Sequence, residues 1–251
     1  MTLPRPRGTR LDQYIVDHGL ADNLHKAMAL IMTGRVLIEG KRTTTPSQTV
    51  LVDADITLEP RPKYVSRGGT KLAHALDYFT INLEGLTALD IGASTGGFTH
   101  CLLQAGAKKV YALDVGHGQL DYKLRQDPRV VVIERTNARY PFQLGDLVNL
   151  VTVDVSFISI TKVLPSIAVH LQDYGTIIAL VKPQFEAYRG EVGIGGVIKD
   201  PRVHARVLGR VIAWAVDNGF RLMDIVPSPI KGSEGNREFF LLLCPRERDQ
   251  A

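Results

Sequence analysis

The sequence contains two cysteines and one tryptophan in 251 residues. Cys101 and Cys244 lie far apart in apolar runs, without a CxxC or zinc spacing, so we expect buried free thiols in a reducing compartment. No apolar run approaches the roughly 18–20 residues of a membrane span, and the polar start lacks the apolar stretch of a secretory signal. These absences predict a soluble, cytoplasmic protein and no membrane partner.

The excess of positive charge is confined to the first part of the chain. Residues 1–71 hold 11 Lys and Arg against 7 Asp and Glu, whereas residues 72–251 hold 19 of each. A basic segment beside a neutral one is typical of a chain whose first part binds a polyanion. A basic solvated surface without a partner explains the same asymmetry, so the charge alone does not decide between them.

Two domains are expected from the pattern of apolar residues and turns. The boundaries are 1–60 for a small first domain, 61–67 for a linker, 68–245 for a large second domain and 246–251 for a tail. In the first domain, a helix is followed by a second helix that Asn23 caps and Gly34 ends. Short strands follow, with a turn at Glu39-Gly40 between the first of them. The first domain is therefore expected to have an α+β fold.

The second domain alternates apolar strands with helices. Seven such strands predict an α/β fold with a mostly parallel seven-stranded sheet and helices on both faces. The last two strands follow each other without a helix between them, which predicts one antiparallel pair. Gly68 and Gly69 are expected to prevent a helix at their positions, so that the first helix of this domain begins at Lys71.

Polar residues stand at the carboxyl ends of five predicted strands, where open α/β sheets bind ligands. They are Asp90, Asp114, Glu134, Asp154 and Lys182. Lys182 is the least expected, because it follows a strand that looks buried and lysine is seldom buried without a partner. Each has an ordinary alternative: Asp114 and Asp154 can cap a helix or turn, and Lys182 can keep an edge strand soluble. Their shared position nevertheless predicts a ligand site.

The first of these strands leads into the glycine-rich turn "DIGASTGG". Such a turn lets the backbone approach a cofactor, but the second glycine of the dinucleotide pattern G-x-G-x-x-G is missing. The pattern D-x-G-x-x-x-G resembles the loop of S-adenosylmethionine (SAM) methyltransferases, and Asp114 suits the ribose hydroxyls of SAM or NAD. The expected cofactor-binding residues are Asp90, Gly92, Ala93, Ser94, Thr95, Gly96, Gly97, Asp114, Asn137 and Asp154. A tight turn alone remains the alternative for the glycines, and turn formation for Asn137.

The first domain resembles a small RNA-binding domain that was first described in a ribosomal protein and is shared with pseudouridine synthases and tyrosyl-tRNA synthetases. The resemblance rests on "RLDQYI" and "NLHKAMALIMTGRVLIEG". It implies contacts with RNA phosphates from Arg10, His25, Lys26, Arg35, Lys41 and Arg42, to which we add Arg67. Surface ion pairs are the alternative for Arg10 and Arg35. The Ser-Arg that usually starts the second helix is absent here, which leaves the individual phosphate contacts open.

Six motifs, in order, resemble the TlyA-type, hemolysin-named rRNA methyltransferases, whose catalytic part is FtsJ-like. They are "YVSRGGTKL", "DIGASTGGFT", "ALDVGHGQLDYKLR", "VDVSFISI", "LVKPQFE" and "SPIKGSEGNREFF". The resemblance implies a Rossmann-like class I SAM-dependent methyltransferase that modifies a ribose 2′-OH, with cytidine as the family's target. It implies ribosomal RNA or ribosomal subunits as partners and no required metal.

The FtsJ-like enzymes surround the acceptor with a Lys-Asp-Lys-Glu set, which Lys71, Asp154, Lys182 and Glu238 match. A ribose hydroxyl is a poor nucleophile and should lose its proton as it attacks a sulfonium methyl. Lys182 is the expected general base, because burial and a neighbouring cation favour the neutral form of a lysine. The other three are expected to position or polarise it. Alternatively, Lys182 stays charged and stabilises negative charge on the oxygen.

Two phenylalanines and a glycine-rich segment have possible roles near the site, and two other functions are considered. Phe157 and Phe185 are candidates to stack on a base or to cover the site with apolar surface. The glycine-rich segment 186–201 predicts a mobile lid whose basic residues Arg189, Lys199 and Arg202 reach RNA. The other functions considered are a membrane-active hemolysin, which needs a segment that enters a bilayer, and an inactive RNA-binding protein.

Overall fold

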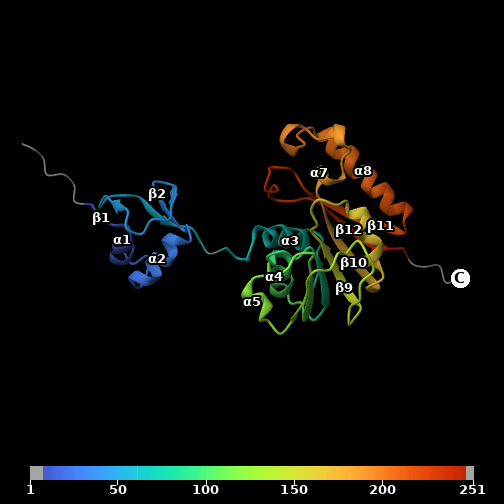
Figure 1. The fold of residues 1–251 in the computed structure, drawn as a ribbon, viewed down its shortest axis with the longest axis horizontal. Coiled ribbons are helices and arrows are strands. Elements are labelled where there is room, and N and C mark those ends of the chain that lie inside the picture. Colours follow the sequence, from blue (N-terminus) through green and yellow to red (C-terminus); the bar gives the residue numbers. More distant parts are fainter. Residues whose placement is uncertain (1–7, 61, 247–251) are drawn as a thin grey trace, which may run out of the picture. The chain divides into compact units, whose positions relative to one another are not determined.

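The computed structural model describes residues 8–60 and 62–246, so expectations for Arg61 and for the ends of the chain lie outside the described residues. Contacts divide the chain into two compact units, between Pro62 and Lys63 (Figure 1). The first unit is blue in Figure 1, and the second runs from teal through green to red. The domain boundaries expected from the sequence, at residues 60 and 68, remain predictions.

The first unit packs two helices against short strands. The helices are α1 (Leu11–Asp17) and α2 (Leu24–Met32), and the strands are β1 (Thr9–Arg10), β2 (Val36–Ile38), β3 (Lys41–Thr43), β4 (Thr49–Val50) and β5 (Ile56–Leu58). β1 pairs with β4, while β2 lies between β3 and β5 in a second antiparallel sheet. Leu11, Ile15 and Ile31 are fully buried in the core of this unit. The expected α+β fold is confirmed.

Turn and cap residues set the limits of these elements as predicted. The Asn23 side chain accepts a hydrogen bond of 2.9 Å from the Lys26 N–H and so caps α2. Gly34, with φ of 68°, follows the end of that helix. Glu39 and Gly40 have φ of 50° and 72°, which is the geometry of a two-residue hairpin turn between β2 and β3.

The second unit is built on a seven-stranded sheet in the described part of the chain (Figure 1). Its strands are β6 (Thr87–Ile91), β7 (Lys109–Leu113), β8 (Val130–Ile133), β9 (Val148–Val153), β10 (Leu171–Val181), β11 (Phe220–Pro227) and β12 (Phe239–Pro245). The order is β11-β12-β10-β9-β6-β7-β8, and the strands from β10 to β8 are parallel. We expected one antiparallel pair, but β12 lies between β10 and β11 and is antiparallel to both.

Helices cover both faces of this sheet, as expected. They are α3 (Arg67–Tyr78), α4 (Gly97–Gln104), α5 (Tyr122–Arg125), α6 (Leu164–Ala168), α7 (Pro183–Glu186) and α8 (Pro201–Asp217), with 3₁₀ turns η1 (Ile160–Lys162), η2 (Arg189–Glu191) and η3 (Ile194–Gly196). Alternate residues of β10 enter two separate cores: Ile177 and Ala179 pack with α6 and α8, whereas Ile178 and Leu180 pack with α3 and α4. The strand before Lys182 is therefore buried on both faces.

The start of α3 corrects one expectation. The helix begins at Arg67 and includes Gly68 and Gly69, so these glycines do not delay it. They serve close packing instead: a Cβ on Gly69 would lie 2.2 Å from Cγ of Tyr64, and one on Gly68 would lie 3.3 Å from the Phe98 ring. The first turn of a helix has few internal hydrogen bonds to lose, so it tolerates glycine.

Part of the segment expected to be a linker packs on α4. The Gln104 side chain donates to the carbonyl of Lys63 at 3.1 Å, and the Val65 N–H donates to His100 Nδ1 at 3.2 Å. Tyr64 is buried in the core that α3 and α4 share. The residues just before α3 are thus held by the helix that follows the glycine loop.

Three further features of the described residues concern membranes, metals and thiols. Among residues 8–60 and 62–246, no helix has the length and apolar character that crossing a bilayer requires. The same residues contain no group of three or more His, Cys, Asp or Glu side chains placed to hold a metal ion. Cys101 and Cys244 are both free; Cys101 is buried as expected, whereas Cys244 is partly exposed.

Candidate active site

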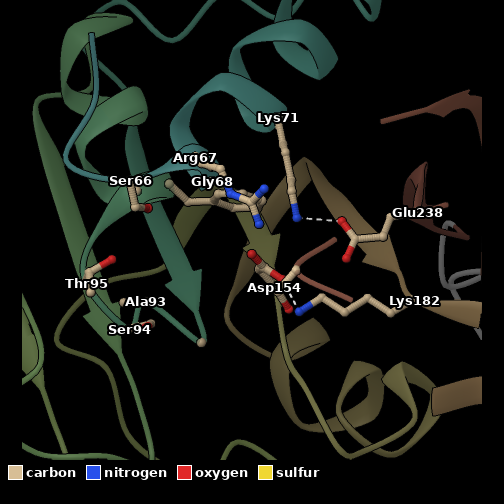
Figure 2. Close-up of a pocket in the computed structure, with 14 residues that line it drawn as sticks. Ser66, Arg67, Gly68, Lys71, Ala93, Ser94, Thr95, Asp154, Lys182 and Glu238 are labelled. Carbon is tan, nitrogen blue, oxygen red and sulfur yellow. Dashed lines mark hydrogen bonds and ion pairs between the residues drawn. The ribbon is translucent and has the colours of Figure 1, made fainter. Parts of the chain in front are cut away.

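The carboxyl ends of three adjacent strands bring the candidate residues together. The glycine loop follows β6, Asp154 follows β9 and Lys182 follows β10, while Glu238 precedes the oppositely directed β12 at the same edge. Figure 2 shows these residues with Lys71 of α3 around a pocket of about 520 Å³. The pocket is lined by Ser66, Arg67, Gly68, Lys71, Gly92, Ala93, Ser94, Thr95, Gly97, Phe98, Asp154, Lys182, Ser233 and Glu238.

Lys71 and Glu238 form a buried ion pair. Lys71 Nζ lies 2.5 Å from Glu238 Oε2, and the two side chains are only 9% and 3% exposed. Gly232 makes room for this carboxylate, since a Cβ there would lie 2.5 Å from Glu238 Oε1. A buried pair is stable only when both charges stay matched, so loss of either partner would leave the other uncompensated.

Lys182 and Asp154 form a second pair on the same pocket (Figure 2). Lys182 Nζ lies 2.7 Å from Asp154 Oδ1 and donates a hydrogen bond of 2.8 Å to Ser156 Oγ. The contact with Asp154 is not aligned as a hydrogen bond, and Oδ1 has no hydrogen-bond donor among the described residues. Asp154 therefore contacts Lys182 Nζ without an aligned hydrogen bond, while Ser156 fixes the direction of Nζ.

The glycine loop is shaped by close approach and by positive φ angles. A Cβ on Gly92, which has φ of 82°, would lie 2.4 Å from the carbonyl oxygen of Asp154. A Cβ on Gly97 would lie 2.2 Å from Ser66 Oγ. Gly96 has φ of 92° and turns the chain into α4 without lining the pocket. The loop thus presents its backbone to the pocket where side chains do not fit.

Asp90 lies beneath this loop and does not line the pocket. Its carboxylate is fully buried and accepts hydrogen bonds from Thr99 Oγ1 at 2.7 Å and from Thr152 Oγ1 at 3.1 Å. Burial raises the pKa of Asp90 to about 7, and the charge of Asp154 adds to this shift, while the two hydroxyl donors oppose it. Asp90 joins β6 to α4 and β9 and supports the loop from below.

Asp114 and Asn137 are not among the residues that line the pocket. The Asp114 carboxylate accepts from the backbone N–H of Ser94 at 2.8 Å and of Gly116 at 2.7 Å. It therefore joins the loops after β6 and β7 and does not cap a helix. Asn137 is exposed, and its side chain accepts from the Arg139 N–H at 3.0 Å, which forms a turn.

Three candidate RNA-binding arginines of the first unit have protein partners. Arg10 pairs with Asp12 at 2.6 Å, and Arg42 pairs with Glu59 at 2.7 Å. Arg35 donates to the backbone carbonyl of Glu59 at 2.7 Å. Glu59 thus holds two arginines side by side, which orders their guanidinium groups on the strand side of this unit.

The other candidate RNA-binding residues differ in their solvent exposure and in the unit to which they belong. Lys26 pairs with Asp22 on the exposed surface of α2. His25 and Lys41 are exposed. Arg67 belongs to the second unit, where it begins α3, and Figure 2 shows its side chain at the pocket beside Lys71.

Several polar residues at the site were not assigned from the sequence. Ser66 and Ser233 line the pocket. Asn236 is 1% exposed; it donates to the carbonyl of Gly196 and accepts from the Ile198 N–H, both at 2.9 Å. Small polar residues in glycine-rich motifs give no chemical signal of their own, so only their position near Lys71 or Glu238 in the sequence could have indicated a role.

Two protein families match this sequence. An FtsJ-like methyltransferase family model matches residues 64–244, and an S4 domain model matches residues 9–56. These matches correspond to the two units of the structure.

Similar proteins carry two kinds of name. The 16S/23S rRNA (cytidine-2′-O)-methyltransferase TlyA of Mycobacterium tuberculosis is 44% identical over 241 residues, which cover 94% of this chain and 90% of that protein. Hemolysin A of Brachyspira hyodysenteriae is 45% identical over 233 residues, which cover 92% and 97%. A solved structure of a hemolysin-named protein from Streptococcus thermophilus has a TM-score of 0.74 at 41% identity, covering 97% of this chain and 90% of that one. The chain belongs to the FtsJ-like methyltransferase family and carries an S4 domain before its methyltransferase domain.

Proposed function

We propose that this protein transfers a methyl group from SAM to a ribose 2′-OH of ribosomal RNA, with cytidine as the modified nucleoside. The observation that carries the proposal is the presence of two lysine–carboxylate pairs, Lys71–Glu238 and Lys182–Asp154, on a pocket that begins at the glycine loop. The name of the mycobacterial relative supports the same acceptor.

The residues of the loop fit SAM as the methyl donor. Gly92 and Gly97 line the pocket at positions where a Cβ would not fit, so their backbone can approach the cofactor. Asp114 is held by two backbone N–H groups and has acceptor directions to spare for ribose hydroxyls. Gly92, Ser94, Thr95, Gly97 and Asp114 would hold the cofactor, and Asp90 would support them. SAM supplies an electrophilic methyl group on a sulfonium sulfur. Contacts of Asn137 with the adenine remain part of this proposal.

Lys182 is the residue we propose to act on the ribose hydroxyl. As a neutral amine it accepts the proton of the 2′-OH while the oxygen–carbon bond forms and the sulfur–carbon bond breaks. Asp154 and Ser156 fix its position, and the Lys71–Glu238 pair adds fixed charge on the other side of the pocket. If Lys182 remains an ammonium, it stabilises the developing negative charge instead. A rate that rises with pH through the neutral range supports the neutral amine, and a flat profile supports the ammonium.

Phe157 is the residue we propose to stack on the target base. Its side chain is 90% exposed, and its ring centroid lies 5.0 Å from that of Phe185. A residue that only covered the site with apolar surface would be buried against it. Stacking on an aromatic ring contributes about 1–3 kcal/mol per base in single-stranded nucleic acid binding.

The S4 domain is proposed to bind the RNA, either free or in a ribosomal subunit, in the cytoplasm where that RNA is found. The direct test uses ribosomal subunits from a strain that lacks this protein, incubated with the protein and tritiated SAM. Label is expected on a ribose of one defined nucleotide. Label on a base, or an absence of label despite SAM binding by calorimetry, contradicts the proposal.

The hemolysin names of some relatives suggest a second function. A membrane-active protein needs a segment that enters a bilayer, and no described helix is long and apolar enough to span one. The polar pocket with two ion pairs has no use in such an activity. Leakage from liposomes at low concentration of the purified protein would favour that function, whereas failure to bind SAM would favour an inactive RNA-binding protein.

A further inference from the structure

The loop after β9, residues 154–160, and helix α7 meet at the edge of the pocket through three side-chain contacts. Lys182, which precedes α7, donates to Ser156 at 2.8 Å, and the rings of Phe185 and Phe157 lie 5.0 Å apart. The third contact is made by Glu186, the last residue of α7. These contacts follow one another in the same order along both segments, so the loop and the helix are linked at three places.

Glu186 makes two hydrogen bonds to the loop. Its Oε2 accepts from Ser159 Oγ at 2.5 Å, and its Oε1 accepts from the Ile160 N–H at 2.8 Å. Both carboxylate oxygens are thus used on neighbouring residues at the far end of the loop. Burial raises the pKa of this carboxyl, while the two hydrogen bonds oppose the shift. Removing a carboxylate from water costs free energy, so stability alone does not explain a glutamate at this position.

The loop between these contacts has a strained backbone. Phe157 has φ of 63°, in the left-handed region that bulky residues rarely adopt. Such a conformation persists where the surrounding contacts determine it. Here Ser156 is held on one side by Lys182, and Ser159 and Ile160 are held on the other by Glu186. The strained residue is also the one whose ring is 90% exposed.

We propose that Glu186 is a positioning residue for the reaction: by holding Ser159 and Ile160 it fixes the loop against α7, which keeps Asp154 and Ser156 within reach of Lys182 and presents the ring of Phe157. This inference rests on the proposed function for its catalytic consequence. The structural part, that Glu186 fixes the loop, stands independently of which substrate is methylated.

Three variants test the proposal in the full-length protein. Glu186→Ala removes both hydrogen bonds to the loop. Ser159→Ala removes one of them, together with the contacts of Ser159 Oγ with Thr161 that cap η1. Glu186→Gln preserves the link, because its carbonyl can accept from the Ile160 N–H while its amide donates to Ser159 Oγ. Asp146→Ala is the matched control: it removes a carboxylate that joins Lys109 and Tyr111 at the other end of β9.

The readouts are hydrogen exchange of the Ile160 amide, the affinity for SAM by calorimetry, and kcat and KM for methylation of ribosomal subunits. We expect Glu186→Ala to exchange faster at Ile160 and to lose about 10- to 100-fold in kcat, with SAM affinity within about twofold of wild type. Ser159→Ala should show a smaller loss of the same kind. Glu186→Gln and Asp146→Ala should keep kcat within about twofold of wild type.

Three results would overturn the inference. They are unchanged exchange at Ile160 in Glu186→Ala, unchanged kcat in that variant, or a loss in Glu186→Gln as large as in Glu186→Ala, which would assign the effect to charge. If Glu186→Ala does not fold, Ser159→Ala decides the same question. Wild-type protein that binds SAM but labels no ribose would instead contradict the proposed function, and the exchange arm would still decide whether Glu186 fixes the loop.

Discussion

Lys182 illustrates how a charged residue can follow a core strand. Residues Ile177 to Val181 of β10 are fully buried, and the lysine comes at the point where the sheet ends and the pocket begins. Pro183 then starts α7, since it cannot continue the strand pairing. The contact with Asp154 and the hydrogen bond to Ser156 give Lys182 Nζ two polar partners, and its side chain is 12% exposed. The buried strand thus ends where the polar site begins, and it fixes the position of Lys182 at the pocket.

Asp90 leads to a prediction about stability and pH. Its pKa in the folded protein, about 7, lies above the ordinary value of 3.8, so the folded state binds this proton more tightly than the unfolded state. The contribution of Asp90 to stability is therefore full below about pH 4 and is lost as pH rises towards 7. Asp90→Asn removes this dependence, and relative to wild type it should gain roughly 2–4 kcal/mol between pH 4 and pH 8.

Urea unfolding of both proteins at pH 4, 6 and 8 measures this difference. Groups that do not interact with Asp90 titrate equally in both proteins, so the change in the difference reports Asp90 together with its coupling to Asp154. Parallel stability curves would show that the carboxylate is not strained by its burial between Thr99 and Thr152.

At the scale of elements, two glycines in helices give opposite predictions. A Cβ on Gly69 of α3 would lie 2.2 Å from Cγ of Tyr64, whereas one on Gly209 of α8 meets nothing within 4 Å. Gly69→Ala should destabilise the protein by about 1–3 kcal/mol and lower activity, because Lys71 lies two residues further along the same helix. Gly209→Ala should stabilise it by about 0.5–1 kcal/mol.

Thermal or urea unfolding and methyl transfer, measured on both variants, check this pair. Gly209→Ala is the control for a general effect of alanine on helices. Equal stability of the two variants would mean that the segment before α3 moves aside without cost, and that Tyr64 does not fix this helix.

The sequence predicted those elements whose signals are local. The cap of α2, the hairpin turn at Glu39 and Gly40, and the two-sided burial of β10 follow from residue type and spacing, and the structure confirms them. The position of β12 between β10 and β11 could not be predicted, because the local sequence does not determine with which strands a returning strand pairs. The prediction for the start of α3 was wrong, because Gly68 and Gly69 do not break the helix. They are glycines because a Cβ would contact Phe98 and Tyr64, which the local sequence does not reveal.

The candidate site was predictable to a similar degree. The four residues of the Lys-Asp-Lys-Glu set all line one pocket. Strand order brings Asp154, Lys182 and Glu238 to one edge of the sheet, and α3 contributes Lys71. What the sequence could not give was the pairing, Lys71 with Glu238 and Lys182 with Asp154, since it depends on side-chain direction. Nor could it show that Asp90 lies below the loop, bonded to Thr99 and Thr152.

For the whole molecule, the uneven charge predicts how RNA affinity responds to salt. Lys41 is exposed on β3, next to Arg42, in the part of the chain that carries the net positive charge. If Lys41 binds a phosphate, Lys41→Ala should weaken RNA binding and reduce the slope of log affinity against log salt by about 1. Lys109→Ala, which removes a paired lysine from the second unit, is the control and should leave the slope unchanged.

Filter binding of ribosomal RNA between low and moderate salt measures both slopes. An unchanged slope in Lys41→Ala would show that this lysine belongs to an ordinary solvated surface, as the charge distribution alone allowed. An equal change in both variants would show that net charge, and not the S4 domain, governs the affinity.

The central claim is methyl transfer to a ribose hydroxyl with Lys182 at the reacting oxygen. The most direct measurement incubates ribosomal subunits with tritiated SAM and either wild-type protein or Lys182→Ala, and then hydrolyses the RNA in alkali. A methylated 2′-oxygen blocks cleavage of the adjacent phosphodiester, so label should appear in an alkali-stable dinucleotide with wild type. Lys182→Ala should bind SAM as before and lose transfer by at least about 100-fold. Label in single nucleotides, or transfer at the wild-type rate by Lys182→Ala, would contradict the account.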